Sequence, residues 1–407
     1  MKIVLIVPVF PQESETFIVN KFTGLIRKGI NVYILCNKTN DEIWNNFTEL
    51  KNNLHYKKRV IKNWPTNPKY YFFIFILPAI FHCLKYNPKG FLNFFKRTKH
   101  LKLLDKFRLF YLNAKLISLK PNLIHYEFGT LMIGNEEISK IIGSHSLVSF
   151  RGYDLNFSGL GKKDYYKKVW QNANVVHVLG EDLWKRAKMR GCPTNKPHIK
   201  IPPAIDGDYF KPSYKKIDQE PNCLSKKINI LSVGRLEWKK GYEFAIQSIR
   251  ILKNYGVGIE YQIIGSGSYY KSLAFITHQL SLESDVKFLG SKKPDEVKQY
   301  MEWADIFLHA AVSEGFCNAV LEAQAMQLPV VTSDADGLGE NIQDGVTGFL
   351  VPRRDPQMMA EKLFILAKKP ELRQQMGLAG RKRVETNFKI EDQINSFAKL
   401  YKDLVNH

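Results

Sequence analysis

Two glutamates stand eight residues apart in the stretch SEGFCNAVLEAQAMQLPVV, which runs from residue 313 to residue 331. Glu314 precedes a helix that the pattern predicts from about residue 318, and Glu322 lies in its first turns. A carboxylate pairs well with vicinal hydroxyls, because its two oxygens accept two O–H donors. The spacing therefore indicates an elongated ligand with hydroxyls at both ends, Glu322 binding a ribose and Glu314 a sugar. A helix cap at Glu314 and a solvated Glu322 are the alternative.

A cationic loop lies upstream in the stretch SVGRLEWKKGYEFAIQ. A strand ends at Val233, a helix begins near Tyr242, and Arg235 and Lys240 stand between them. Such a loop favours anions, because backbone N–H groups, the helix dipole and two cations converge there. A diphosphate fits this loop. A basic turn in which Arg235 forms a salt bridge is the simpler explanation.

Backbone groups could complete the site. The amides of Gly315, Phe316 and Cys317 precede a helix and would face sugar or phosphate oxygens. Gly265 and Gly267 follow a predicted strand, where they serve either a phosphate or only close helix–sheet packing. Gly290, in the segment FLGSKKP, follows the next predicted strand.

Short apolar runs alternate with helical patterns along the whole chain of 407 residues, which predicts parallel sheets covered by helices on both faces. The Pro- and Gly-containing stretch IPPAIDGDYFKP interrupts this order. We expect an α/β protein with two doubly wound, Rossmann-like domains, residues 1–205 and 206–386, which face a central cleft. A C-terminal helix, residues 387–407, should cross back to the first domain.

The net charge of +21 is unevenly distributed, because residues 51–120 contain sixteen Lys or Arg and one acid, Asp105. The same window holds the aromatic runs YYFFIFILPAIF and FLNFF. This combination favours contact with an anionic membrane surface. A core helix with a solvated basic face, or binding of single-stranded nucleic acid, remains open. No apolar run is long enough to span a bilayer.

The five cysteines are widely spaced and form no CxxC pair, a pattern that argues against a disulfide framework and against a structural zinc site. They are Cys36, Cys83, Cys192, Cys223 and Cys317. The triplet Asp334-Ala335-Asp336 has the spelling of a metal-binding DxD motif but follows a strand exit.

Three ordered motifs carry a resemblance to a known family: GRLEWKKG, the Glu314/Glu322 pair and DGLGENIQDGVTGFLVP. They resemble retaining glycosyltransferases of family 4, which have the GT-B fold. PQESETFI and SFRGYD further resemble the subgroup that builds exopolysaccharides of the colanic acid and amylovoran type. The resemblance implies that Arg235 and Lys240 hold the donor diphosphate, Glu322 the ribose and Glu314 the donor sugar. It implies no cofactor and no metal, and it favours a uridine nucleotide while leaving a guanosine nucleotide open. It also implies that the segment FLGSKKP, with Gly290, contacts the nucleotide base through its backbone.

The first domain departs from the family pattern. Arg151 stands where many members place a reaction-centre histidine, and it can clamp an oxygen but cannot act as a base. His125 is a candidate catalytic residue or a core histidine, and Glu127 replaces a second histidine. We expect Glu127 and Asp154 on the acceptor side.

The loop after the first strand also differs, because Ser14, Glu15 and Thr16 replace a glycine-rich sequence. We expect this loop to line the cleft, with the following helix N-terminus facing the donor phosphates.

These features predict a metal-independent, retaining glycosyltransferase. It would move a sugar from a nucleotide donor to a hydroxyl of a saccharide or lipid-linked acceptor in bacterial surface polysaccharide synthesis. We expect it in the cytoplasm, at the inner face of the plasma membrane. A basic nucleic-acid-binding protein, or a GT-B phosphorylase or nucleotide-sugar epimerase, is the alternative.

Overall fold

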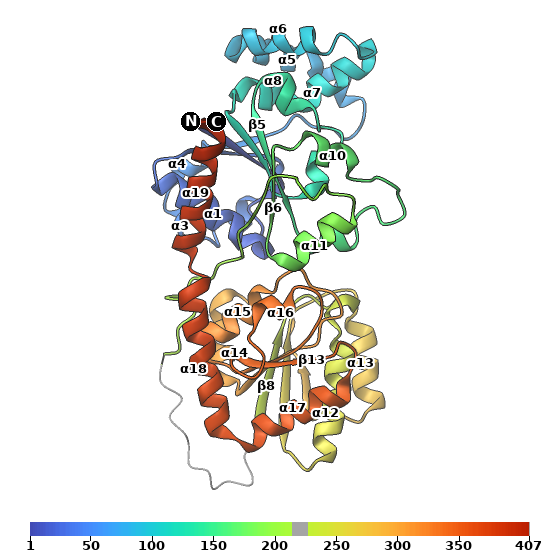
Figure 1. Cartoon of the computed structure of the whole chain (residues 1–407), viewed down its shortest axis with the longest axis vertical. Coiled ribbons are helices and arrows are strands. Elements are labelled where there is room, and N and C mark those ends of the chain that lie inside the picture. The colour runs from blue at the N-terminus through green and yellow to red at the C-terminus, as the bar shows by residue number, and fades with distance from the viewer. Residues whose placement is uncertain (214–226, 407) are drawn as a thin grey trace. The chain divides into compact units, whose positions relative to one another are not determined.

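The computed structural model describes residues 1–213 and 227–406, so Cys223 lies outside the described residues. The chain divides into two compact units. Unit 1 comprises Met1–Pro202 and Glu391–His407, and unit 2 comprises Pro203–Ile390 (Figure 1). The four described cysteines are free.

Unit 1 is built on a sheet of seven parallel strands in the order β3-β2-β1-β4-β5-β6-β7. Its central strands read as nearly continuous apolar runs, because helices bury both faces of a parallel sheet. The strands are β1 (Lys2–Phe10), β2 (Asn31–Thr39), β3 (Val60–Lys62), β4 (Leu123–Tyr126), β5 (His145–Phe150), β6 (Val175–Val178) and β7 (His198–Lys200).

The helices of unit 1 fill the crossovers between these strands, as the alternation predicted. They are α1 (Thr16–Arg27), α2 (Asp41–Trp44), α3 (Thr48–Lys51), α4 (Leu54–Lys57), α5 (Tyr71–Tyr86), α6 (Pro88–Arg97), α7 (Leu103–Leu119), α8 (Ile138–Ile142), α9 (Gly152–Asn156), α10 (Lys167–Asn172) and α11 (Glu181–Met189), with 3-10 turns η1 (Glu13–Glu15) and η2 (Gly129–Met132). Helices α5, α6 and α7 lie between β3 and β4 in sequence and pack on one another, and we call them the three-helix insert.

The C-terminal helix α19 (Ile390–Asn406) belongs to unit 1, although it follows unit 2 in sequence. It begins three residues later than the expected residue 387, which is instead the last residue of α18. Its apolar face buries Ile394, Phe397 and Tyr401. A Cβ on Gly24 of α1 would lie 2.2 Å from the Ile394 side chain, so the two helices are in close contact.

Unit 2 has six parallel strands in the order β10-β9-β8-β11-β12-β13, which makes it a second doubly wound unit. Its strands are β8 (Ile228–Val233), β9 (Ile259–Ile264), β10 (Val286–Phe288), β11 (Ile306–His309), β12 (Val330–Ser333) and β13 (Gly348–Val351). Its helices are α12 (Tyr242–Asn254), α13 (Tyr270–Gln279), α14 (Pro294–Trp303), α15 (Asn318–Ala325), α16 (Leu338–Asn341), α17 (Pro356–Lys368) and α18 (Pro370–Asn387), with the 3-10 turn η3 (Trp238–Lys240).

Across the described residues, no helix combines the length and apolar character that a membrane span requires.

Candidate functional site

The loop from Ser313 to Cys317 joins β11 to α15 at the carboxyl edge of the unit 2 sheet, where ligands of such folds bind. Asp336 fixes this loop, because its Oδ2 accepts from Ser313 Oγ at 2.7 Å and from the Glu314 amide at 3.2 Å. The Gly337 amide donates to the Glu314 carbonyl at 3.1 Å. A Cβ on Gly337 would lie 2.0 Å from the Gly315 carbonyl oxygen, so only glycine fits there.

Asn341 determines which backbone amides of the loop can bind a ligand. Its Oδ1 accepts from the Cys317 amide at 3.0 Å, and its Nδ2 donates to the Cys317 carbonyl at 2.8 Å. The prediction that the Cys317 amide faces a ligand is therefore wrong, since this donor is occupied within the protein. The Gly315 and Phe316 amides donate to no described residue and remain available at the start of α15.

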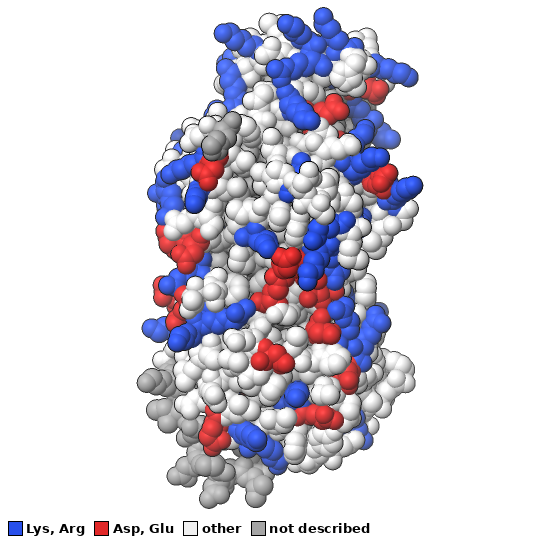
Figure 2. Space-filling view, in the orientation of Figure 1, with Lys and Arg blue, Asp and Glu red and all other residues white. Residues whose placement is uncertain are grey.

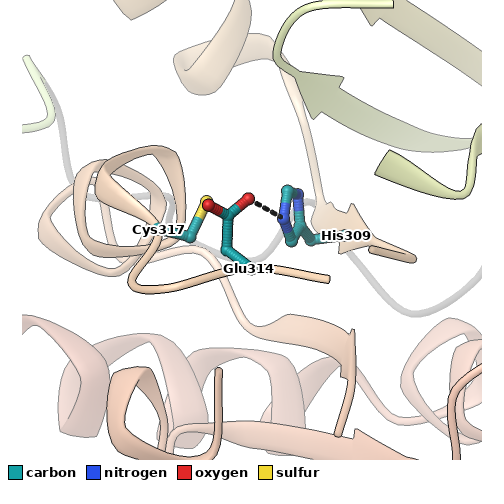
Figure 3. Close-up of side chains that lie close together, drawn as sticks. All are labelled: His309, Glu314 and Cys317. Carbon is teal, nitrogen blue, oxygen red and sulfur yellow. Dashed lines mark ion pairs between the residues drawn. The ribbon is translucent and has the colours of Figure 1, made fainter. Parts of the chain in front are cut away.

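Glu314 forms an ion pair with Lys240, and the two side chains are 17% and 12% exposed. His309, at the end of β11, places Nε2 3.7 Å from Oε2 of Glu314 (Figure 3). Burial alone would raise the pKa of Glu314, but the Lys240 ammonium and the His309 imidazole outweigh it and lower the pKa to about 2. Burial opposes the charged form of His309, yet Cys317 and Glu314 outweigh it and raise its pKa to about 9.

One group among the described residues has the composition of a cation site: His309, Glu314 and Cys317 place ligand atoms within 4.8 Å of one another. The Lys240 ammonium is bound to the same Oε2 of Glu314. A divalent ion would therefore have to compete with this lysine. The expectation of no metal stays a prediction.

The Asp334-Ala335-Asp336 triplet has a structural role here. Arg353 contacts Oδ1 of Asp334 at 3.3 Å and Oδ1 of Asp336 at 3.1 Å. Because Asp336 also supports the loop, this pair of acids holds protein groups together.

The cationic loop ends at Lys240 in η3, directly before Gly241. Gly241 has φ +62°, and a Cβ there would lie 2.1 Å from the Ala310 carbonyl oxygen, so this glycine lets η3 approach the end of β11. Arg235 is 64% exposed and pairs with Glu237 at 2.8 Å. Lys239 contacts the same Glu237 at 3.3 Å. The three cations of the loop are thus paired with two acids, Glu237 and Glu314.

Glu322 lies half-buried in α15, and its carboxylate forms no hydrogen bond or ion pair with any residue the structure describes. Burial raises its pKa to about 7. A partly desolvated carboxylate without a protein partner is available to accept hydrogen bonds from a ligand.

The two glycines that follow β9, Gly265 and Gly267, allow close packing of the backbone against the loop after β8. A Cβ on Gly265 would lie 1.9 Å from the Gly234 carbonyl oxygen, and one on Gly267 would lie 2.2 Å from that of Leu236. The Gly265 amide donates to the Gly290 carbonyl at 2.9 Å. The structure thus supports the close-packing interpretation of the G-x-G segment, and a ligand role for these three glycines stays a prediction.

Unit 1 contains a buried ionic cluster centred on Glu127. Lys21 Nζ donates to both oxygens of Glu127 at 2.8 and 2.9 Å, and Arg151 Nη2 lies 3.4 Å from one of them. Asp154 is also buried and accepts from the Arg151 amide at 3.0 Å. Glu127 and Asp154, expected on the acceptor side, are therefore engaged within the fold, which does not support that role.

His125 is not placed to touch a substrate, which corrects its assignment as catalytic. Its side chain is fully buried, with Nδ1 2.6 Å from the Tyr401 hydroxyl of α19 and Nε2 2.7 Å from Ser149 Oγ. Ser149 continues the chain to His177 at 2.7 Å. Burial lowers the pKa of His125 well below its usual value, so the ring is a neutral core group.

The loop after β1 remains a candidate ligand-binding segment. Glu15 ends η1, its Oε2 is buried without a hydrogen-bond partner, and burial raises its pKa to about 7. Thr16 is the first residue of α1. The side chain of Ser14 lies outside what the structure describes. Arg151 stacks on Phe17 of α1, with its guanidinium carbon 3.7 Å from the ring centroid.

Sequence reasoning missed three residues that shape these clusters: Lys21, His309 and Asp336. Lys21 lies one turn after the buried Ile18 of α1, so its position on the helix was the signal that could have identified it as a buried lysine in need of an acid. His309 ends the strand that leads to Glu314, which places it at the carboxyl edge of the sheet. No local pattern predicts that Asp336 contacts Glu314.

Comparison with known proteins places the chain among sugar transferases. A family model described as "Glycosyl transferases group 1" matches residues 213–383. The amylovoran biosynthesis glycosyltransferase AmsK of Erwinia amylovora is 30% identical over 95% of this chain and 96% of its own length. The putative colanic acid biosynthesis glycosyltransferase WcaL of Escherichia coli is 27% identical over 89% of this chain and 90% of its own. These relatives confirm the resemblance to the exopolysaccharide subgroup.

Solved structures confirm the GT-B fold. The alignment with sucrose-phosphate synthase from Thermosynechococcus elongatus spans 99% of this chain and 99% of that protein, with a TM-score of 0.75 and 17% identity. Anabaena Alr3699/HepE, solved in complex with UDP-glucose, covers 99% of this chain and 100% of its own with a TM-score of 0.72 and 15% identity.

Proposed function

This chain belongs to the group 1 glycosyltransferases, and from that premise we propose that it transfers a sugar, with retention of configuration, from a nucleotide sugar to an acceptor hydroxyl. The pairing of Lys240 with Glu314 beside the cationic loop carries this proposal. This ion pair supports a site in which the diphosphate of the donor takes the place of the Glu314 carboxylate as the partner of the buried Lys240 ammonium.

In the proposed reaction, the bond between the anomeric carbon and the terminal phosphate oxygen breaks, and the acceptor oxygen forms the new bond on the same face. The nucleoside diphosphate leaves with the electron pair, and its phosphate oxygen takes the acceptor proton. Lys240 and Arg235 stabilise the charge that develops on the leaving group. When the diphosphate binds Lys240, Glu314 is released to accept from hydroxyls of the donor sugar.

Glu322 would bind the ribose. Its carboxylate lacks a partner among the described residues and sits in the first turns of α15, eight residues after Glu314. The Gly315 and Phe316 amides are suited to phosphate or sugar oxygens because they are unpaired donors at a helix N-terminus.

The donor is proposed to be a uridine diphosphate sugar, bound without a metal ion or cofactor. The Anabaena structure in complex with UDP-glucose supports the choice of nucleotide, since that protein shares the fold of this chain. Lys240 and Arg235 supply positive charge at the diphosphate, which is the part that a metal ion plays in metal-dependent transferases.

The acceptor is proposed to be a saccharide carried on a lipid diphosphate at the inner face of the plasma membrane, in bacterial surface polysaccharide synthesis. The names of the amylovoran and colanic acid relatives support the pathway class. The positive charge of unit 1 supports an anionic membrane surface as partner. The comparisons do not favour a nucleic-acid-binding protein, a phosphorylase or an epimerase.

A panel of nucleotide sugars tests the proposal by thermal shift, because a ligand that binds only the folded state raises the melting temperature. We expect a uridine diphosphate sugar to give the largest shift and the Lys240→Ala variant to lose it. Equal shifts by all nucleotides, or an unchanged shift in the variant, would contradict the assignment.

A further inference from the structure

Helix α5 carries an apolar face that the fold of unit 1 does not use. Seven large apolar side chains on this helix and at its start are exposed, and Tyr86 alone among them lies away from the face that the others share. The other six are Tyr70, Phe73, Ile74, Leu77, Phe81 and Leu84. At the helical repeat of 3.6 residues per turn, they fall within an arc of about 100°. They therefore form one continuous stripe, which we call the α5 stripe.

The opposite face of α5 holds the insert together. Ala79 and Cys83 are fully buried, and the Phe72 ring packs edge-to-face on Tyr111 of α7 at 5.4 Å. Helix α5 thus has one apolar face that packs into the core of the three-helix insert and a second apolar face that is exposed to solvent. A helix that only covered the core would present polar side chains on the second face.

The exposed apolar side chains concentrate in the three-helix insert. In the described part of the chain, eleven of twenty-two exposed large apolar side chains lie between residues 70 and 112. They include Leu92 of α6 and Leu103 and Leu104 at the start of α7. Scattered exposed apolar residues need no explanation, but a concentration of this kind marks a binding surface.

The charge of the same region is strongly positive. Residues 63–120 contain eleven Lys or Arg and one acid, Asp105. Lys69, Lys85 and Lys89 are exposed around the two ends of α5. Figure 2 shows Lys and Arg side chains gathered over the part of unit 1 where Figure 1 places α5 and α6. Cations at the border of an apolar stripe match an anionic bilayer, where they meet headgroups while the stripe enters the acyl boundary.

We infer that the α5 stripe inserts into one leaflet of an anionic lipid bilayer, with α5 lying along the membrane surface. This inference rests on the proposed function, since a lipid-linked acceptor is found at such a surface. Helix α5 has sixteen residues, which suits a helix that lies in the interface and is too short for a span.

Vesicle flotation tests this inference with the full chain. Vesicles of phosphatidylglycerol and phosphatidylcholine in equal parts are compared with pure phosphatidylcholine. We expect binding to the anionic vesicles and at least a ten-fold weaker partition for the double variant Leu77→Glu/Phe81→Glu, because two charges would then enter the acyl boundary. The matched control is Met189→Glu/Phe275→Glu, which changes two exposed apolar residues elsewhere and should bind as the wild type does.

A second pair of variants tests the electrostatic part. Lys85→Glu/Lys89→Glu leaves the stripe intact and should weaken binding to anionic vesicles, most clearly at low salt. In vesicles with brominated acyl chains, the fluorescence of the tryptophan introduced by Phe81→Trp should be quenched. The fluorescence of the tryptophan introduced by Met189→Trp should not be. Quenching at both positions or at neither would contradict insertion through α5.

The outcomes separate this inference from the proposed function. UDP titration of each variant should give the wild-type affinity, since none of the changed residues belongs to the donor site. Wild-type vesicle binding in Leu77→Glu/Phe81→Glu would overturn the inference and leave the proposed function standing. Self-association of the wild type that this double variant abolishes, without vesicle binding, would show that a second copy covers the stripe. Vesicle binding without any response to nucleotide sugars would instead count against the proposed function.

Discussion

The free carboxylate of Glu322 leads to a prediction in which stability and donor binding change in opposite directions. Burial raises its folded-state pKa from 4.5 to about 7, so the folded protein loses stability as pH rises between these values. Glu322→Gln removes that loss. The variant should melt at a higher temperature than the wild type at pH 8 and show little difference near pH 4.5.

The same substitution should weaken donor binding, because a ribose diol needs a carboxylate with two acceptors. At pH 8 we expect about a three- to ten-fold weaker affinity for UDP, the loss of about one hydrogen bond. With UDP-glucose, whose diphosphate does not titrate in this range, wild-type affinity should decline as pH falls through 7, while that of Glu322→Gln should stay level. Calorimetric titration across this range measures both, and parallel pH profiles would contradict the assignment.

Arg235 should act chiefly on turnover, because its charge matters most when the diphosphate leaves. Arg235→Ala should lower kcat by about 100-fold, the usual size for a lost charge-stabilising contact. Initial rates at saturating donor measure this effect. The control Lys271→Ala removes an exposed cation of α13 and should retain the wild-type rate. A wild-type rate in Arg235→Ala would remove this residue from the diphosphate site.

Among the elements, the loop between β11 and α15 depends on Gly337. A Cβ at this position would lie 2.0 Å from the Gly315 carbonyl oxygen, so Gly337→Ala must displace the loop that carries Glu314. We expect at least ten-fold weaker binding of UDP-glucose together with a lower melting temperature, as for other overpacked sites. Gly161→Ala is the control, because nothing lies within 4 Å of the added carbon. Equal affinities of the two variants would show that this loop is not part of the site.

The sequence predicted the elements better than their contacts. Periodicity located the strands of the unit 2 sheet and the five central strands of the unit 1 sheet, but not the short edge strands β3 and β7. The spacing of Glu314 and Glu322 indicated carboxylates at the start of α15. The pairing of Lys240 with Glu314 joins residues 74 positions apart, and no local rule specifies it. The support from Asp336 and Asn341 likewise depends on how the strands are ordered.

Burial is the second property that sequence reasoning could not supply. His125 and Glu127 have residue types suited to chemistry, yet both are fully buried, and their partners Tyr401 and Lys21 are far away in sequence. The aromatic runs of the insert were predicted to touch a membrane or to form a core. The structure divides them, since Phe94 is buried while Phe73 and Phe81 are exposed.

For the molecule as a whole, the division into two units predicts that stability and donor binding can be changed separately. Lys21→Met leaves the buried Glu127 with Arg151, at 3.4 Å, and the neutral His125 ring, at 3.5 Å, as its neighbours, which should lower the free energy of unfolding by about 3–5 kcal/mol. Denaturant unfolding measures this change. UDP affinity should be unaffected, because Lys21 is buried in unit 1, whereas Arg235, Lys240 and Glu322, which are proposed to bind UDP, belong to unit 2.

The double variant Lys21→Met/Glu127→Gln is the control for that prediction. It removes both charges and should recover part of the lost stability, because no unpaired carboxylate remains. A single variant as stable as the wild type would show that the buried pair contributes nothing, and a change in UDP affinity would show that the cluster acts on the donor site.

The central claim is that Lys240 exchanges Glu314 for the diphosphate of a nucleotide sugar, and calorimetric titration of UDP into the wild type, Lys240→Ala and Lys271→Ala tests it most directly. We predict that Lys240→Ala binds UDP about 10- to 100-fold more weakly, the range for a hydrogen bond to a charged group, and that Lys271→Ala binds as the wild type does. Equal affinities for all three proteins would contradict the account.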